Sequence, residues 1–215
     1  MKPLTAPSVR QRIVDVAQRL QAQELVVGTS GNVSAREPGT NQYWITPSGV
    51  AYDRLEPNDL VLVDSDGQVR DGSLKPSSDT AVHLAIYRSR PEIDAVIHTH
   101  SPYATAFSVV QRDIPPVLVE AAGFLGGPVR SDGTIGSDRA VLLPNHGVLA
   151  VGESLDLAYS AAVTVEHMAR VALLAGLIGK PQQVPQSEID RMHTFLHTEY
   201  GQRRPRAGVE EGRDA

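Results

Sequence analysis

The chain of 215 residues contains no cysteine. This absence excludes disulfide bridges, cysteine nucleophiles and thiolate metal ligands, so any bound metal has to be held by imidazole or carboxylate groups. The first twelve residues have no signal-like apolar core, and no stretch is expected to cross a bilayer. We therefore expect a cytoplasmic protein that does not have a membrane as a partner.

Positive charge is also scarce, because 20 Lys and Arg residues stand against 25 Asp and Glu, giving a net charge of -5. Without a long basic stripe to neutralise phosphates, the chain is not expected to bind nucleic acid. Both common nucleotide-binding glycine motifs, G-x-x-x-x-G-K-[ST] and G-x-G-x-x-G, are absent. The 21% charged and 41% apolar residues suit one folded domain over residues 1–201, whereas the charged tail 202–215 is predicted to be disordered.

Helical and extended patterns alternate along the chain. Short extended segments separated by tight turns, such as Asp66-Gly67, favour antiparallel pairing. Apolar spacing and capping residues predict helices over about 8–24, 78–90, 101–110, 154–177 and 187–199. Strands are predicted over about 33–36, 43–46, 60–64, 68–70, 95–100 and 139–143.

Three histidines are the most informative polar residues. His98 and His100 alternate on a predicted strand, so their side chains point the same way, and His146 follows a second predicted strand. Three imidazoles on one divalent metal leave a coordination position open for substrate, as in catalytic rather than structural sites. These residues alone leave a second interpretation open, in which the first two form a hydrogen-bonded surface pair and the third precedes a glycine turn.

Three loops combine small hydroxyl residues with glycine or proline, at 29–32, 46–49 and 75–78. Exposed backbone N–H groups and hydroxyls in such turns suit a phosphate, and Ser77 and Ser78 precede a predicted helix whose positive end would face an anion. Each loop taken singly is better explained as just a turn and a helix cap.

Five segments in this order make the chain resemble the class II aldolase/adducin family, which includes L-fuculose-phosphate aldolases and L-ribulose-5-phosphate 4-epimerases. The resemblance extends from about residue 8 to residue 200. The segments are Gly-Thr-Ser-Gly-Asn-Val-Ser-Ala-Arg at 28–36, Ile-Thr-Pro-Ser-Gly-Val at 45–50, Lys-Pro-Ser-Ser-Asp at 75–79, His-Thr-His-Ser-Pro at 98–102 and Leu-Pro-Asn-His-Gly at 143–147.

The resemblance implies a single-domain, three-layer α/β/α fold around a mainly antiparallel sheet. It also implies a homotetramer with active sites between neighbouring subunits. By motif match, zinc, manganese or cobalt would be held by His98, His100 and His146. The pocket for the phosphate of a sugar-phosphate substrate would be formed by Gly31, Asn32, Ser48, Gly49, Ser77 and Ser78.

The implied activity is metal-dependent retro-aldol cleavage of a ketose phosphate through a stabilised enediolate, with Asp79 as the catalytic acid/base. The alternative is a 4-epimerase that breaks the same bond and rejoins it. Decarboxylase and dehydratase relatives also exist. A non-catalytic adducin-like assembly domain is the third hypothesis, and it is disfavoured because the histidine set is complete.

Two departures from the family pattern stand out. Fuculose-phosphate aldolases usually carry glutamate where this chain has Asp79, whereas the 4-epimerases carry aspartate. The segment 130–138 is shorter than in relatives and lacks their tyrosine proton donor, for which Tyr200 is a weak substitute. Other polar residues are interpreted without a catalytic role. His83 is expected to be a core or interface histidine, and surface pairing is expected for Glu166, His167, His193 and His197.

Overall fold

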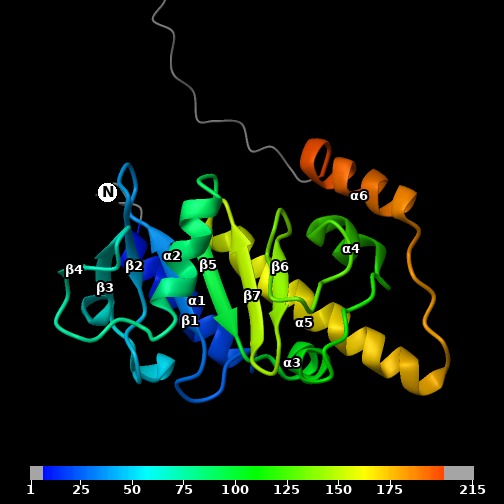
Figure 1. Cartoon of the computed structure of the whole chain (residues 1–215), viewed down its shortest axis with the longest axis horizontal. Coiled ribbons are helices and arrows are strands. Elements are labelled where there is room, and N and C mark those ends of the chain that lie inside the picture. The colour runs from blue at the N-terminus through cyan, green and yellow to red at the C-terminus, as the bar shows by residue number, and fades with distance from the viewer. Residues whose placement is uncertain (1–6, 201–215) are drawn as a thin grey trace, which may run out of the picture.

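The computed structural model describes residues 7–200. These residues build a seven-stranded sheet in the order β4-β3-β2-β1-β5-β7-β6, and every neighbouring pair is antiparallel (Figure 1). The strands are β1 Asn32–Arg36, β2 Gln42–Ile45, β3 Val61–Asp64, β4 Val69–Asp71, β5 Ala95–Thr99, β6 Ala140–Leu143 and β7 Gly147–Gly152. The expectation of an antiparallel sheet is confirmed.

The helices begin close to the residues that the capping pattern predicts. The Ser8 and Ser154 side chains each accept a hydrogen bond from the backbone N–H three residues later, which satisfies a donor that the first turn leaves free. The α-helices are α1 Val9–Ala22, α2 Thr80–Ser89, α3 Pro102–Val109, α4 Val119–Leu125, α5 Leu155–Ile178 and α6 Gln186–Thr198. Two 3₁₀ turns, η1 Tyr52–Arg54 and η2 Pro57–Asp59, precede β3.

The two faces of the sheet are covered by different helices, which produces the expected three-layer arrangement (Figure 1). Alternate residues of β5 divide between the faces: Ala95 and Ile97 pack with α1 and α5, whereas Val96 packs with α2. Ser34 of β1 also faces α2, since its hydroxyl contacts His83 of that helix at 2.7 Å. By the same alternation, His98 lies on the α2 side of the sheet.

Helix α5 corrects one sequence-based expectation. By length and composition it is apolar enough to cross a membrane, although no such segment was expected. Its inner side is buried against β5 and β7, and Val165 and Met168 on that side are 0% exposed. A helix that packs in the core of a globular domain has the same composition, which explains its apolar character here.

One strand and one α-helix have no counterpart in the sequence-based prediction, and neither do the two 3₁₀ turns. β7 is a run of small apolar residues that are all buried, so it lacks the alternation that reveals a half-exposed strand. α4 has seven residues, which is too short for a helical period to show. The predicted disordered tail 202–215 lies outside the described residues.

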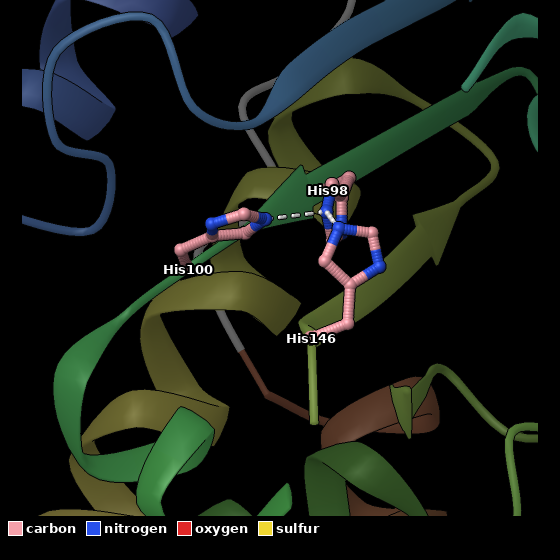
Figure 2. Close-up of side chains that lie close together, drawn as sticks. All are labelled: His98, His100 and His146. Atoms are coloured by element: carbon pink, nitrogen blue, oxygen red, sulfur yellow. Dashed lines mark hydrogen bonds between the residues drawn. The ribbon is translucent and has the colours of Figure 1, made fainter. Parts of the chain in front are cut away.

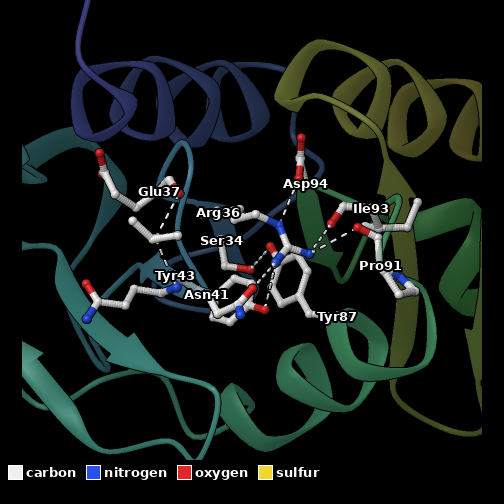
Figure 3. Close-up of polar contacts among 11 residues, drawn as sticks. Ser34, Arg36, Glu37, Asn41, Tyr43, Tyr87, Pro91, Ile93 and Asp94 are labelled. Carbon is white, nitrogen blue, oxygen red and sulfur yellow. Dashed lines mark hydrogen bonds and ion pairs between the residues drawn. The ribbon is translucent and has the colours of Figure 1, made fainter.

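Hydrogen bonds from Arg36 connect the end of β1 to the turn that leads into β5 (Figure 3). Its guanidinium donates to Asp94 Oδ1 at 2.9 Å, to Tyr43 Oη at 3.0 Å and to the carbonyl oxygens of Pro91 and Ile93 at 3.3 and 3.1 Å. Because these contacts connect β1, β2 and the start of β5, they hold in place the strand that ends near His98.

Candidate functional site

The three predicted histidines meet at one point (Figure 2). His98 Nε2 lies 2.9 Å from His100 Nε2 and 3.3 Å from His146 Nε2. His98 is buried, His100 is half-buried and His146 is exposed, so the cluster opens to solvent on one side. The structure therefore brings together side chains that are 48 residues apart in sequence.

A tight turn between β6 and β7 presents the third histidine. Asn145 has φ of 54°, in the left-handed region that asparagine tolerates better than most residues, and His146 N donates to Leu143 O at 3.0 Å. β7 then pairs with β5, with Val148 opposite Thr99. A Cβ on Gly147 would lie 2.3 Å from Thr99 O and 3.0 Å from His100 Cδ2, so only glycine allows this close approach.

The hydrogen bond made by Nδ1 of His98 determines which ring nitrogen carries the proton. Its Nδ1 donates to Val148 O at 2.9 Å, which leaves the lone pair on Nε2 in the neutral ring. Burial lowers the pKa of His98 to about 4, an effect that the Val148 contact partly opposes and the neighbouring His146 and His100 reinforce. Burial and the nearby His146 also lower the pKa of His100. Both rings are therefore neutral near pH 7.

This donor set fits a divalent metal. Zinc bound to histidine at about 2.0–2.1 Å in tetrahedral geometry would place two nitrogens about 3.3 Å apart, close to the observed separations. The single lone pair on His98 Nε2 is poorly suited to accept hydrogen bonds from both neighbouring imidazoles at once. A cation, by contrast, can be bound by the lone pairs of all three nitrogens. The cluster could thus bind a metal, with the carbonyl of Val148 as a partner that orients one ligand.

Asp79 lies at the edge of the histidine cluster. It is the N-cap residue of α2, but its side chain makes no capping hydrogen bond. Instead its Oδ2 accepts a hydrogen bond from Asn32 Nδ2 at 2.7 Å and lies 3.9 Å from His98 Nε2. The carboxyl group is therefore turned away from the helix and toward the candidate metal ligands, which disfavours the explanation that it only stabilises the helix dipole.

The three loops with the sequence features of an anion site lie side by side. Ser48 N donates to Lys75 O at 2.9 Å and Ser77 N donates to Thr46 O at 3.1 Å, which joins the second loop to the third. Asn32 at the end of the first loop reaches Asp79 at the end of the third. Ser77 is buried, with its hydroxyl accepting from Asp79 N, whereas Ser48, Gly49 and Ser78 are exposed and Gly31 is half-buried.

Gly31 in the first loop has a steric reason to be glycine. Its φ is 82°, and a Cβ there would lie 2.7 Å from the carbonyl oxygen of His98. The loop can therefore pass close beside β5 only because this side chain is missing. This approach brings the first loop against the strand that carries the histidines.

Residues 11–173 match the family model described as "Class II Aldolase and Adducin N-terminal domain". The chain belongs to this family. Among its relatives, a 5-deoxy-D-ribulose 1-phosphate aldolase of Bacillus thuringiensis is 33% identical over 85% of this chain and 92% of its own length. An L-ribulose-5-phosphate 4-epimerase of Salmonella paratyphi B is 32% identical over 78% of this chain and 85% of its own length.

Solved structures of class II aldolases share the fold of this family member. One titled "L-fuculose 1-phosphate aldolase" superposes with a TM-score of 0.84 at 30% identity, over 92% of this chain and all of that chain. An L-fuculose-1-phosphate aldolase from Thermus thermophilus superposes with a TM-score of 0.69 at 30% identity, over 79% of this chain and 97% of that chain. The three-layer architecture is therefore that of the family.

Several other polar residues can now be placed. His83 is a core histidine, as predicted: it is 1% exposed and its Nδ1 contacts Ser34 Oγ. Burial lowers the pKa of His83 to about 3. Tyr200 is 70% exposed and contacts Phe195 edge-on, and segment 130–138 contains no helix or strand.

The expectation of surface pairing holds for His193 and His197, whose ring centroids lie 4.1 Å apart, but it is wrong for Glu166, and His193 has a further contact. Both carboxyl oxygens of Glu166 accept backbone hydrogen bonds at the start of α3, and His193 Nδ1 contacts the carbonyl oxygen of Gly123 in α4 at 2.9 Å. Sequence spacing along one helix could not reveal these contacts because both partners lie on other helices.

Proposed function

We propose that this protein is a metal-dependent aldolase that cleaves a ketose phosphate by a retro-aldol reaction. The observation that carries the proposal is the convergence of three imidazole nitrogens with the Asp79 carboxyl group beside them. His98, His100 and His146 would hold Zn²⁺, for which imidazole is a well-suited ligand, with Mn²⁺ or Co²⁺ as alternatives. The fourth coordination position would be open to substrate.

A divalent ion bound here would stabilise the negative charge that develops on two neighbouring substrate oxygens as an enediolate forms. In the cleavage step the hydroxyl group next to the breaking bond would lose its proton to a water molecule. The carbon–carbon bond then breaks, its electron pair stays with the ketose fragment, and the other fragment leaves as an aldehyde. Asp79 would then deliver a proton to the carbon that lost the bond. Asn32 holds Asp79 by its amide, so that the carboxyl group faces the site before substrate arrives.

We propose that the three adjoining loops bind the substrate phosphate. The phosphate would meet hydroxyl groups and those backbone N–H groups that are not used between the loops, while hydrogen bonds hold the loops together. The residues are Gly31, Asn32, Ser48, Gly49, Ser77 and Ser78. The likeness to 5-deoxyribulose 1-phosphate aldolases supports a ketose 1-phosphate as the substrate class. Cleavage of such a substrate would release dihydroxyacetone phosphate and a short aldehyde.

A 4-epimerase is the second candidate, favoured by one observation. The catalytic position carries aspartate, as in the 4-epimerase pattern, and a 4-epimerase is among the relatives above 30% identity. An epimerase would retain the aldehyde, rotate it and rejoin the bond. Free aldehyde from a ketose 1-phosphate therefore supports the aldolase, and interconversion of pentulose 5-phosphates without free aldehyde supports the epimerase.

We also propose a cytoplasmic homotetramer with active sites between subunits. In support, the end of α5 carries apolar side chains that the single chain leaves in solvent, with Leu177 78% and Ile178 90% exposed. Such a surface suits burial against another copy. Light scattering coupled to gel filtration should give about four times the chain mass, and a monomer would contradict this part of the proposal.

The decisive experiment measures aldehyde and dihydroxyacetone phosphate released from 5-deoxyribulose 1-phosphate. The protein is assayed as purified, after chelation, and after Zn²⁺, Mn²⁺ or Co²⁺ is restored. We expect activity to disappear with chelation and to return with at least one ion. His146→Ala should prevent the return, whereas His167→Ala, which removes an exposed histidine outside the cluster, should not. Full activity in chelated protein would overturn the metal mechanism.

A further inference from the structure

The start of α3 needs hydrogen-bond acceptors that its own sequence does not supply. The helix begins directly after Ser101, one residue beyond His100, and Pro102 occupies its first position without an N–H group. The Ser101 side chain makes no capping hydrogen bond, and its buried hydroxyl has no partner among residues 7–200. Thr105 N donates to Ser101 O at 2.9 Å, so two backbone donors, those of Tyr103 and Ala104, remain free.

Glu166 of α5 supplies both missing acceptors. Its Oε1 accepts from Tyr103 N at 3.0 Å and its Oε2 accepts from Ala104 N at 2.9 Å. A carboxylate at the N-terminus of a helix also interacts favourably with the helix dipole. Its neighbours Val165 and Ala169 are 0% exposed in the core, so the carboxyl group is attached to a firmly packed part of α5.

The imidazole of His100 depends on its backbone more than that of His98 does. His98 has a hydrogen bond from Nδ1 to Val148 O, and His146 sits in a hydrogen-bonded turn. His100 follows the last residue of β5, and within the described part of the chain its Nδ1 has no hydrogen-bond partner. Its ring is therefore held in place by the short segment between β5 and α3.

We propose that Glu166 is a positioning residue for the candidate metal centre. By capping α3 it fixes Ser101, and through Ser101 it fixes the backbone that aims His100 at the other two imidazoles. Glu166 thus does for His100 indirectly what the Val148 carbonyl does directly for His98. This inference rests on the proposed function, because it concerns the geometry of the same three ligands.

The test compares Co²⁺ binding by the full chain and by variants, after removal of bound metal. Glu166→Gln keeps the size of the side chain but offers one acceptor oxygen, and we expect its Co²⁺ dissociation constant to rise about 10-fold to 100-fold, the range found when an orienting partner of a metal ligand is lost. The visible spectrum of bound Co²⁺ should also change, since that spectrum reports coordination geometry. Urea unfolding of the metal-free proteins gives their stabilities alongside.

Two matched controls separate positioning from general destabilisation. Val165→Ala removes buried packing from the same turn of α5 without touching the cap, and His167→Gln changes the exposed neighbour. Both should bind Co²⁺ within about threefold of the unmodified chain, even where Val165→Ala lowers stability as much as Glu166→Gln. If Glu166→Gln fails to fold, Glu166→Asp, which keeps the carboxylate one methylene further back, replaces it in the comparison.

The outcomes are distinguishable. Unchanged Co²⁺ affinity and spectrum in Glu166→Gln would overturn this inference. It would also be overturned if Val165→Ala lost Co²⁺ affinity as well, so that the loss in both variants followed their loss of stability. If the unmodified chain binds no Co²⁺, or binds it equally after His146→Ala, the proposed metal centre itself fails. Weakened binding and an altered spectrum confined to the Glu166 variant would support the positioning role.

Discussion

The side-chain amide of Asn32 donates a hydrogen bond to Oδ2 of Asp79 at 2.7 Å, although the two residues are 47 positions apart. Asn32 is buried at the first residue of β1, and its Oδ1 has no partner among the described residues. The amide therefore holds the proposed acid/base group on one side and leaves an acceptor free on the other. We therefore expect Asn32 to position Asp79, in addition to the phosphate contact inferred from its motif.

Asn32→Ala is expected to lower kcat by up to about 100-fold, because a misplaced catalytic carboxyl group loses most of its advantage. Metal affinity should change little, since Asn32 does not contact the three imidazoles in a hydrogen bond. Steady-state kinetics and Co²⁺ titration check the two statements. The control is Asn58→Ala, at an exposed position. Equal kcat values in both variants would contradict the role given to Asn32.

Gly147→Ala should destabilise the fold and the metal centre together. The added Cβ would meet Thr99 O at 2.3 Å, so β7 would have to move away from β5, at a cost of about 1–3 kcal/mol. The matched control is Gly176→Ala in α5, where no atom lies within 4 Å of the added carbon. That change should stabilise the helix by about 0.5–1 kcal/mol. Urea unfolding should give opposite signs for the two variants.

Acid should destabilise the metal-free fold partly through His83. Burial lowers its folded-state pKa to about 3, below the value of about 6.5 in an unfolded chain. The folded state then binds fewer protons than the unfolded state between these two pH values. The stabilising contribution is complete above about pH 6.5 and is lost as pH falls, by about 1.4 kcal/mol per pH unit.

His83→Gln is therefore expected to reduce the slope of unfolding free energy against pH between about pH 6 and pH 4 by roughly that amount. Urea unfolding at several pH values, in the presence of a chelator, measures the slope. His167→Gln is the control, because it removes an exposed histidine rather than a buried one. If both variants change the slope equally, the effect does not come from the buried ring.

Because the backbone of Asn145 is left-handed, we expect this position to tolerate substitution by glycine better than substitution by alanine. Asn145→Gly should keep stability and Zn²⁺ affinity, because glycine adopts a φ of 54° without steric cost. Asn145→Ala should lose about 1–2 kcal/mol of unfolding free energy and should bind Zn²⁺ more weakly, since relaxation of this residue would turn His146 away. Competition with a chelating dye measures the affinity. A better result for alanine than for glycine would contradict this account of the turn.

The sequence by itself was sufficient for features that depend on neighbouring residues. Serine caps marked the starts of α1 and α5, and the alternation of His98 and His100 indicated that their side chains point the same way, although His100 lies one residue beyond the end of β5. The order of five short motifs was enough to indicate the family and the antiparallel α/β/α fold, which the family model and the solved structures confirm. These signals are local, because capping and side-chain alternation act within a few residues.

Only the tertiary structure decided which distant groups meet. It inserted β7 between β5 and β6, a strand without polar alternation, and so brought His146 to His98. It joined Asn32 to Asp79 and assigned Glu166 to the start of α3 rather than to a surface pair. Such contacts satisfy buried polar groups across separate elements, and neither helical spacing nor strand alternation records which element will supply the partner.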